Sequence, residues 1–176
     1  MKKHIQIVMS ILLMFASSTL FAQNSNVIRM IAQSIRSHKS MEVSFTYQTT
    51  GDTEAPKEGK AYLQDKAYKV ILEDQQTISD GTTLWHYLVE DEEVIVGNAT
   101  DDDSPFKILD ELERDSSGIT PIIDQNGHLK ALEIEVEDGV KITLNIIEMK
   151  FDQEYKEDFF TFDTKAHPEI DVIDMR

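Results

Sequence analysis

The chain has 176 residues, with 33 acidic and 17 basic side chains, and its formal net charge at pH 7 is −16. Such an acidic chain is not expected to bind nucleic acid or anionic lipid headgroups through bulk electrostatics. The sequence contains no cysteine, so the fold must depend on its own apolar core and not on disulfides.

Residues 1–22 are typical of a cleaved signal peptide. Lys2 and Lys3 supply a positive start, the stretch 5–15 is mostly apolar, and small residues lead to Ala22. This order predicts secretion with cleavage after Ala22. The alternative of a membrane anchor is weaker, because the apolar run is shorter than the roughly 20 residues that a spanning helix needs. The mature chain would have no cysteine for a lipid anchor, so we expect a soluble periplasmic protein that is not itself a lipoprotein.

Residues 23–176 are expected to form a single domain that begins with a helix. Apolar side chains recur there at helical spacing, at Val27, Ile28, Ile31 and Ile35. Basic residues follow near the expected end of the helix, where cations suit the helix dipole.

From residue 41 the pattern changes to that of antiparallel strands. Apolar and polar side chains alternate over 41–48, which predicts a half-buried strand. Hairpin dipeptides separate later strands at Asp80-Gly81, Asn126-Gly127 and Asp138-Gly139. The predicted strands are 41–48, 60–64, 68–73, 77–79, 82–89, 93–97, 119–123, 129–136, 140–151 and 159–162. The final residues, 168–174, are expected to trail off without regular structure.

The strand over 140–151 changes parity near its middle. Its apolar side chains occupy even-numbered positions up to Ile146 and odd-numbered positions from Ile147 onward. Since a shift of one residue moves every following side chain to the other face, this predicts a β-bulge or a change of packing partner.

A second helix is predicted to open at Ser104-Pro105. Phe106, Ile108, Leu109 and Leu112 recur there at helical spacing. One-sided strands with two amphipathic helices predict the α+β class. We expect a strongly curved antiparallel sheet around an apolar interior that the helices cover. A closed small barrel is the alternative.

Catalytic motifs are missing from the sequence. We find no nucleophile elbow, glycine-rich phosphate loop or cysteine nucleophile, and the histidines are scattered singly. The aspartates at 101–103 lack the spacing of a calcium loop, and the turn at 124–127 is explained as a hairpin. We therefore expect no enzyme, no cofactor and no metal site.

The most informative stretch is 77–87, which reads Thr-Ile-Ser-Asp-Gly-Thr-Thr-Leu-Trp-His-Tyr. Taken alone, it predicts a tight hairpin with two aromatic side chains on one face of the second strand. It also resembles the signature of the LolA-type lipoprotein carrier family, in which Ser-Asp-Gly-x-x-Leu-Trp-x-Tyr follows a strand pair. Three further segments agree in order, at 43–48, 104–106 and 159–174.

The resemblance implies a half-open β-barrel with helices covering its open side. Its cavity would take the acyl chains of lipoproteins from the inner to the outer membrane. The implied partners are acylated lipoproteins, a transient inner-membrane release complex and an outer-membrane receptor, with the carrier itself a monomer. From strand parity, the predicted lipid-binding cavity side chains are Phe45, Tyr47, Tyr68, Val70, Leu72, Leu84, Ile134, Val136, Ile142 and Leu144. The predicted lid-helix side chains are Ile108, Leu109 and Leu112. The same parity also suits an ordinary filled core.

One departure from the family concerns the latch of the lid. The family arginine that ties the lid closed has no match near Lys66, and lysine is a poor substitute for a planar bidentate donor. A different class of function stays open: a periplasmic regulatory or interaction module on the same fold would bind an envelope protein and not lipid. An anchored acceptor of the related LolB type is disfavoured, since the sequence has no cysteine.

Overall fold

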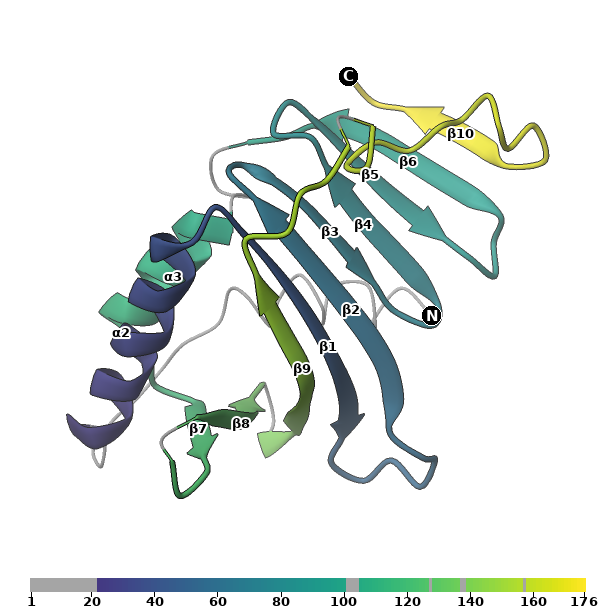
Figure 1. Cartoon of the computed structure of the whole chain (residues 1–176). Helices are drawn as coiled ribbons and strands as arrows, with labels where there is room; N and C mark the ends of the chain where they lie inside the picture. The colour runs from purple at the N-terminus through teal and green to yellow at the C-terminus, as the bar shows by residue number, and fades with distance from the viewer. Residues whose placement is uncertain (1–21, 101–104, 127, 137–138, 157) are drawn as a thin grey trace.

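The computed structural model describes residues 22–100, 105–126, 128–136, 139–156 and 158–176 (Figure 1). The expected signal peptide and the aspartates at 101–103 lie outside these ranges. The described helices are α2 (Ala22–Ser37) and α3 (Pro105–Arg114). The strands are β1 (Ser40–Thr49), β2 (Lys57–Gln64), β3 (Ala67–Ile71), β4 (Gln75–Ser79), β5 (Thr83–Leu88), β6 (Glu93–Asn98), β7 (Ile119–Ile123), β8 (Leu129–Glu135), β9 (Lys141–Phe151) and β10 (Asp171–Asp174).

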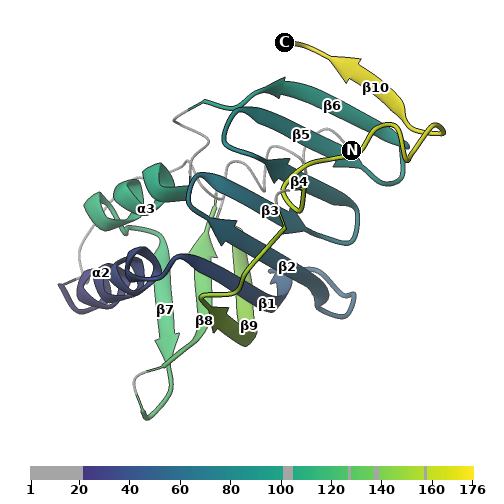
Figure 2. The same ribbon diagram turned by 45° about the horizontal axis from the view of Figure 1, so that its top comes forward.

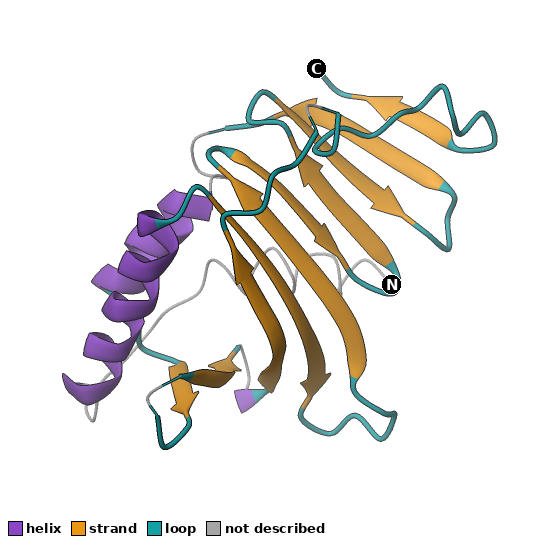
Figure 3. Ribbon diagram, in the orientation of Figure 1, coloured by secondary structure: helices purple, strands orange, loops and turns teal. Residues whose placement is uncertain are grey.

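The strands form one sheet in the order β10-β6-β5-β4-β3-β2-β1-β9-β8-β7. Neighbouring strands are antiparallel, except that β10 runs parallel to β6. Figure 3 shows the strands spread as an open sheet with both helices gathered on one side. The α+β class is therefore confirmed. The sheet is neither closed nor strongly curled, so the expected half-open barrel is not confirmed.

The two helices follow the apolar periodicity of the sequence. Within α2, Ile28 and Ala32 are one turn apart and both are buried. Pro105 begins α3, where its fixed φ suits the first turn and its missing N–H costs no helical hydrogen bond. Both predicted helices are thus present.

One face of the sheet packs against the helices, and we call it the helix face. Its core joins Ile28 of α2 to Ile119 of β7 and Ile134 of β8, and Leu112 of α3 packs against this cluster. Figures 1 and 2 both show the helix pair beside β7, β8 and β9 and away from β5 and β6. The helices therefore cover one end of this face.

The opposite face carries a second core, and we call it the C-terminal face. Val94 and Val96 of β6 are buried there with Ile170, and the ring of Tyr87 packs against Phe162. Further along the chain segment after β9, Phe159 lies edge-on to Tyr62 of β2. The segments 152–156 and 158–170 thus pack against this face over β2 to β6, so the sheet has a core on each of its two faces.

The prediction for the end of the chain was wrong in two places. Residues 159–162 form turns and not a strand, with Phe159 N–H donating to Lys156 and Thr161 N–H donating to Asp158. Their aromatic side chains favoured a strand in the sequence, but these rings fill the core of the C-terminal face instead. Residues 171–174, expected to be irregular, pair with β6 as β10.

The predicted parity change in the last long strand is confirmed as a β-bulge. Phe45 of β1 lies opposite Ile146, whereas Ser44 lies opposite Glu148. Ile147 is the extra residue between them, and it is 61% exposed. The bulge keeps apolar side chains on the helix face along both halves of β9.

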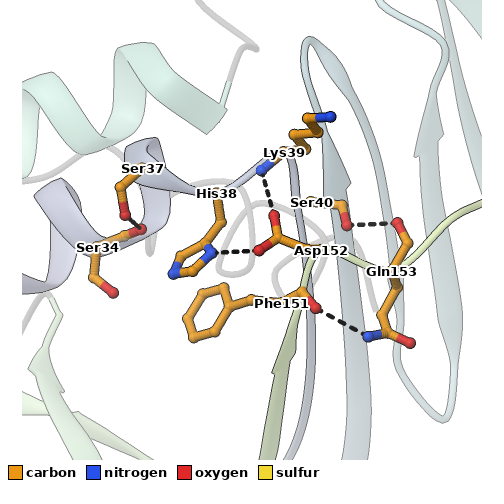
Figure 4. Close-up of polar contacts among 8 residues, drawn as sticks. All are labelled: Ser34, Ser37, His38, Lys39, Ser40, Phe151, Asp152 and Gln153. Atoms are coloured by element: carbon orange, nitrogen blue, oxygen red, sulfur yellow. Dashed lines mark hydrogen bonds and ion pairs between the residues drawn. The ribbon is translucent and has the colours of Figure 1, made fainter.

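The joint between α2 and β1 is fastened to the end of β9 (Figure 4). His38 Nδ1 lies 2.7 Å from Asp152 Oδ2, and the His38 ring stacks on Phe151 with centroids 4.2 Å apart. The backbone N–H of Lys39 donates to the same carboxylate over 2.9 Å. These contacts fix where the helix leaves the sheet.

Candidate functional site

The strand registers place all the predicted cavity side chains on the helix face. Tyr47 lies opposite Leu144, and Ile142 lies opposite Ile134, whose side chain is part of the core beneath the helices. The same face continues across β2 to β5 through the pairs Ala61–Val70, Leu63–Tyr68 and Ser79–Leu84. Val136 follows β8 directly and packs against the same core cluster.

These residues separate into two groups by what covers them. Ile134, Val136 and Leu144 belong to the core beneath the helices, and Ile142 is only 3% exposed. At the β9 end these side chains therefore pack together beneath the helices. Of the predicted lid residues, Leu112 contacts this core, Leu109 is half-buried, and the side chain of Ile108 lies outside the described part.

The second group lies on β1 and β3 and continues to the start of the β3–β4 turn, and we call it the β1–β3 patch. Its members are largely half-buried apolar or aromatic side chains, and Leu72 is the most buried at 8% exposure. The patch consists of Phe45, Tyr47, Tyr68, Val70 and Leu72. Leu84 of β5, 9% exposed, lies on the same face beyond it.

Gly59 of β2 forms the floor between the two sides of the patch. A Cβ atom at this position would lie 2.5 Å from Phe45 Cε2 and 3.0 Å from Leu72 Cδ2. The Phe45 ring therefore lies over the glycine backbone and reaches across β2 toward β3. A glycine in a strand weakens local pairing propensity, but here it admits a ring that the strand otherwise excludes.

A charged pair borders the patch at one end. Lys57 Nζ lies 3.5 Å from Glu73 Oε2. Partial burial works to lower the pKa of Lys57, but the carboxylate of Glu73 outweighs it and the pKa is raised. Burial raises the pKa of the neighbouring Tyr47 phenol, and the charge of Asp74 adds to this. Tyr47 is thus a neutral hydroxyl at the rim of the patch at pH 7.

The motif at 79–87 forms a turn and part of the opposite core. Asp80 Oδ1 accepts hydrogen bonds from the N–H groups of Thr82 and Thr83, and Ser79 Oγ accepts from Gly81 N–H. Gly81 has a φ of 86°, a left-handed conformation that suits glycine. The two aromatic residues of the motif do share one face, as predicted, but it is the C-terminal face. Leu84 is the one residue of the motif that was predicted to line the cavity, and it lies on the helix face.

The two helices are linked by Arg36, which was expected only as a basic residue near the end of the first helix. Arg36 at the end of α2 donates through Nη2 to Asp110 and through Nη1 to Glu113 of α3, each over 2.5 Å. Lys66, the position considered for a latch, lies in the β2–β3 turn close to Gly81. The sequence did hold a signal for this contact: a basic side chain at the end of one predicted helix and acidic side chains on the outward face of the other.

A groove of about 680 Å³ lies at one end of β1, β2 and β3. It reaches Phe45 and Leu72 of the patch, and the loop containing Pro56 forms another part of its wall. Lys60 and Ile71, which are paired on the C-terminal face, line it as well. The groove therefore meets the patch at Phe45 and Leu72 and is lined by residues from both faces of the sheet.

Other kinds of site are not found in the described ranges. No cluster of three or more histidine, aspartate or glutamate side chains there is arranged to hold a metal ion. No described helix is long and apolar enough to cross a membrane.

Comparison with known proteins gives similarity of structure but not of sequence. No protein-family model matches the chain, and no curated protein is significantly similar to it. An uncharacterized conserved protein from Thermus thermophilus is similar in structure with 12% identity, a TM-score of 0.53, and coverage of 86% of this chain and 99% of that one. This match shows a shared fold.

Two further solved structures align less well. A LolA superfamily protein from Nitrosomonas europaea has 11% identity and a TM-score of 0.47 over 83% of this chain and all of its own. A DUF1329 family protein from Desulfovibrio piger has 8% identity and a TM-score of 0.41 over 85% of this chain and all of its own. Scores at this level add no argument about function.

Proposed function

We propose that the protein is a periplasmic carrier that binds the acyl chains of lipoproteins and moves them from the inner to the outer membrane. The observation that carries the proposal is the β1–β3 patch, a row of apolar and aromatic side chains that continues into the core beneath the helices. The sequence resemblance at 77–87 supplies the carrier role.

The energetics of the patch suit a transient acyl ligand. Removing a methylene group from water contributes about 0.8 kcal/mol, so a single acyl chain gains much from covering a surface of this kind. Phe45 and Val70 are only half-buried, and a chain laid along them removes further apolar area from water. A half-covered surface also permits release, which a closed core does not.

The helix pair provides a cover that moves as one unit. Arg36 links α2 to α3, and Ile28 of α2 packs against Ile119 of β7 and Ile134 of β8. A tilt of the pair about the joint between α2 and β1 would widen or narrow the space beside the patch without separating the helices. Donor and acceptor complexes at the two membranes would act on this cover.

Mass spectrometry of lipid extracted from the native protein tests the proposal. We expect acyl chains to be recovered with the wild type and to fall in Val70→Gln, which places an amide in the patch. Val172→Gln on β10, where the side chain is 48% exposed, is the matched control and should retain them. Recovery equal to that of a mock purification, or equal recovery from Val70→Gln, would overturn the proposal. Crosslinking of one non-acylated envelope protein would support the interaction module instead.

A further inference from the structure

The helix face changes from apolar to polar between β3 and β4. One row of paired residues crosses the sheet from Val43 through Ala61 and Val70 to Thr77 and His86. Its first three members are apolar and its last two form hydrogen bonds. The row therefore has one apolar end, on the β1–β3 patch, and one polar end.

All of the helix-face side chains of β4 are polar. Gln75 and Ser79 flank Thr77 on this face, and they are 8% and 1% exposed. The apolar Ile78 of the same strand points to the other face, where it is 1% exposed. On a face that continues an apolar patch, apolar side chains are the usual choice, because a buried polar group requires a hydrogen-bonding partner. β4 has the opposite arrangement, with polar side chains on this face.

We call Gln75, Thr77 and Ser79 of β4, together with His86 of β5, the polar strip. Thr77 and His86 form a cross-strand pair at its centre. Thr77 Oγ1 lies 3.1 Å from His86 Nδ1. A hydroxyl has one donor and two acceptor positions, so either tautomer of the imidazole leaves Oγ1 able to make another hydrogen bond. If Nδ1 donates, the hydroxyl proton can be directed to a carbonyl. If Nδ1 accepts, the remaining lone pairs can accept from an amide or alcohol.

The charge around the polar strip is unsuited to an anion. Residues 70–106 contain no lysine or arginine, and they include a run of acidic side chains at 90–93. The lysine on the helix face at the border of the patch, Lys57, is paired with Glu73. A phosphate on β4 or β5 would find no lysine or arginine on either strand, and Lys66, in the turn beside Gly81, is already engaged in another interaction.

We propose that the bound ligand is an acyl amphiphile with a neutral, hydrogen-bonding headgroup, which lies at the half-buried pair of Thr77 and His86 between β4 and β5 while its chain lies on the β1–β3 patch. Ester, amide and hydroxyl groups supply this chemistry, as in an acylated glycerol or an acylated peptide. The inference rests on the proposed acyl-chain binding and adds the headgroup class and its location. Thr77 is its central specificity residue.

Competition against a neutral fluorescent apolar probe, N-phenyl-1-naphthylamine, tests the inference. Monopalmitoyl glycerol and a palmitoylated dipeptide amide are the two neutral competitors and distinguish the two sources of this chemistry. Palmitoyl lysophosphatidic acid and palmitoyl choline carry the same chain with an anionic or a cationic headgroup. We expect at least one neutral competitor to displace the probe about tenfold more effectively than either charged one.

Substitutions then locate the headgroup. Thr77→Val keeps the side-chain shape and removes the hydroxyl. It should lower the affinity for the preferred neutral competitor roughly three- to tenfold and leave the affinity for the probe unchanged. Thr77→Ser should restore most of the affinity. Thr46→Val is the matched control, because Thr46 lies on β1 with the opposite parity to Phe45 and faces away from the patch.

The outcomes separate this inference from the proposed function. Displacement by charged competitors equal to that by the neutral ones, or an unchanged affinity in Thr77→Val, overturns the headgroup assignment while acyl binding stands. No binding of the probe and no displacement by any competitor overturns acyl binding and the headgroup assignment with it.

Discussion

The ring of Phe45 on β1 lies directly over the backbone of Gly59 on β2. These residues are register partners, and a Cβ atom on Gly59 would approach Phe45 Cε2 to 2.5 Å and Cζ to 2.6 Å. The contact lays an aromatic ring flat across the centre of the β1–β3 patch. The shape of the proposed binding surface thus depends on the absence of a side chain at a strand position.

Gly59→Ala should therefore displace the Phe45 ring. Forcing a methyl group into a filled site costs about 1 to 3 kcal/mol, and we expect a loss of this size in the free energy of unfolding measured with urea. Gly97→Ala is the matched control, since Gly97 lies on the same face of β6 and a Cβ there meets no atom within 4 Å. Equal stability of the two variants would contradict this account of the patch.

Arg36→Gln should loosen α3 from α2 while leaving the fold intact. The side chains of Arg36 and Asp110 are 31% and 56% exposed, so we expect less than about 1 kcal/mol from these ion pairs. Hydrogen exchange of the α3 amides should become faster, and high salt should have the same effect on the wild type. Arg29→Gln, an exposed position on the same helix, should change neither. Unchanged exchange in Arg36→Gln would show that apolar packing alone joins the helices.

Asp152→Asn should alter the response to acid. The hydrogen bond from His38, aided by the backbone N–H of Lys39, lowers the pKa of Asp152 below its ordinary value of 3.8. A lowered pKa stabilises the fold above that ordinary value, and the stabilisation is lost as the pH falls through the lowered pKa. Wild type should thus be more stable than Asp152→Asn near neutral pH, and the difference should shrink below about pH 4. Urea midpoints across this range measure it, with Asp91→Asn in an exposed turn as the control. A difference that stays constant with pH would contradict the assignment.

Tyr155→Phe should remove an alkaline transition. Burial, with a further contribution from the charge of Glu42, raises the pKa of the Tyr155 phenol to about 12. The folded state holds this proton longer than the unfolded state does, so stability present below pH 10 should fall between about pH 10 and pH 12. Tyr155→Phe should lose less stability over this interval and should lack the latest phenol absorbance change. If Tyr155→Phe retained this absorbance change, the change would belong to another tyrosine.

Tyr155→Phe should not lower the free energy of unfolding at neutral pH. The Tyr155 hydroxyl is buried and has no hydrogen-bond partner in the part of the chain that the structure describes. Its ring stacks on Phe159 with centroids 4.6 Å apart, and phenylalanine preserves that contact. Removing an unpaired buried hydroxyl is neutral or stabilising. Tyr87→Phe, on the same face, should keep the late absorbance change and serves as the control.

Local patterns predicted most of the elements of the fold. The 3.6-residue period located both helices, and the change of parity at Ile147 located the bulge, because both depend on neighbouring residues only. The end of the chain was not predictable in this way. Phe159 has strand propensity, but its packing was decided by Tyr62 of β2, a contact distant in sequence.

The sequence predicted which side chains of the candidate site share a face, but not which of them are covered by other parts of the chain. Alternation identified which side chains share a face, from Tyr47 to Leu144. It did not show that the helices cover the β9 end and that Phe45 lies over Gly59, since both depend on where the helices and rings pack in three dimensions. The polar strip containing Thr77 also became visible only when the registers joined it to the patch.

The central claim is that an acyl chain lies on the β1–β3 patch of the helix face. Photolabelling of the intact protein with a palmitoyl probe bearing a diazirine in the chain, followed by peptide mapping, tests it most directly. Our account predicts labels on Phe45, Val70 and Leu72 that excess monopalmitoyl glycerol removes. Labels confined to the C-terminal face around Tyr62 and Phe159, or labels that no competitor removes, would contradict it.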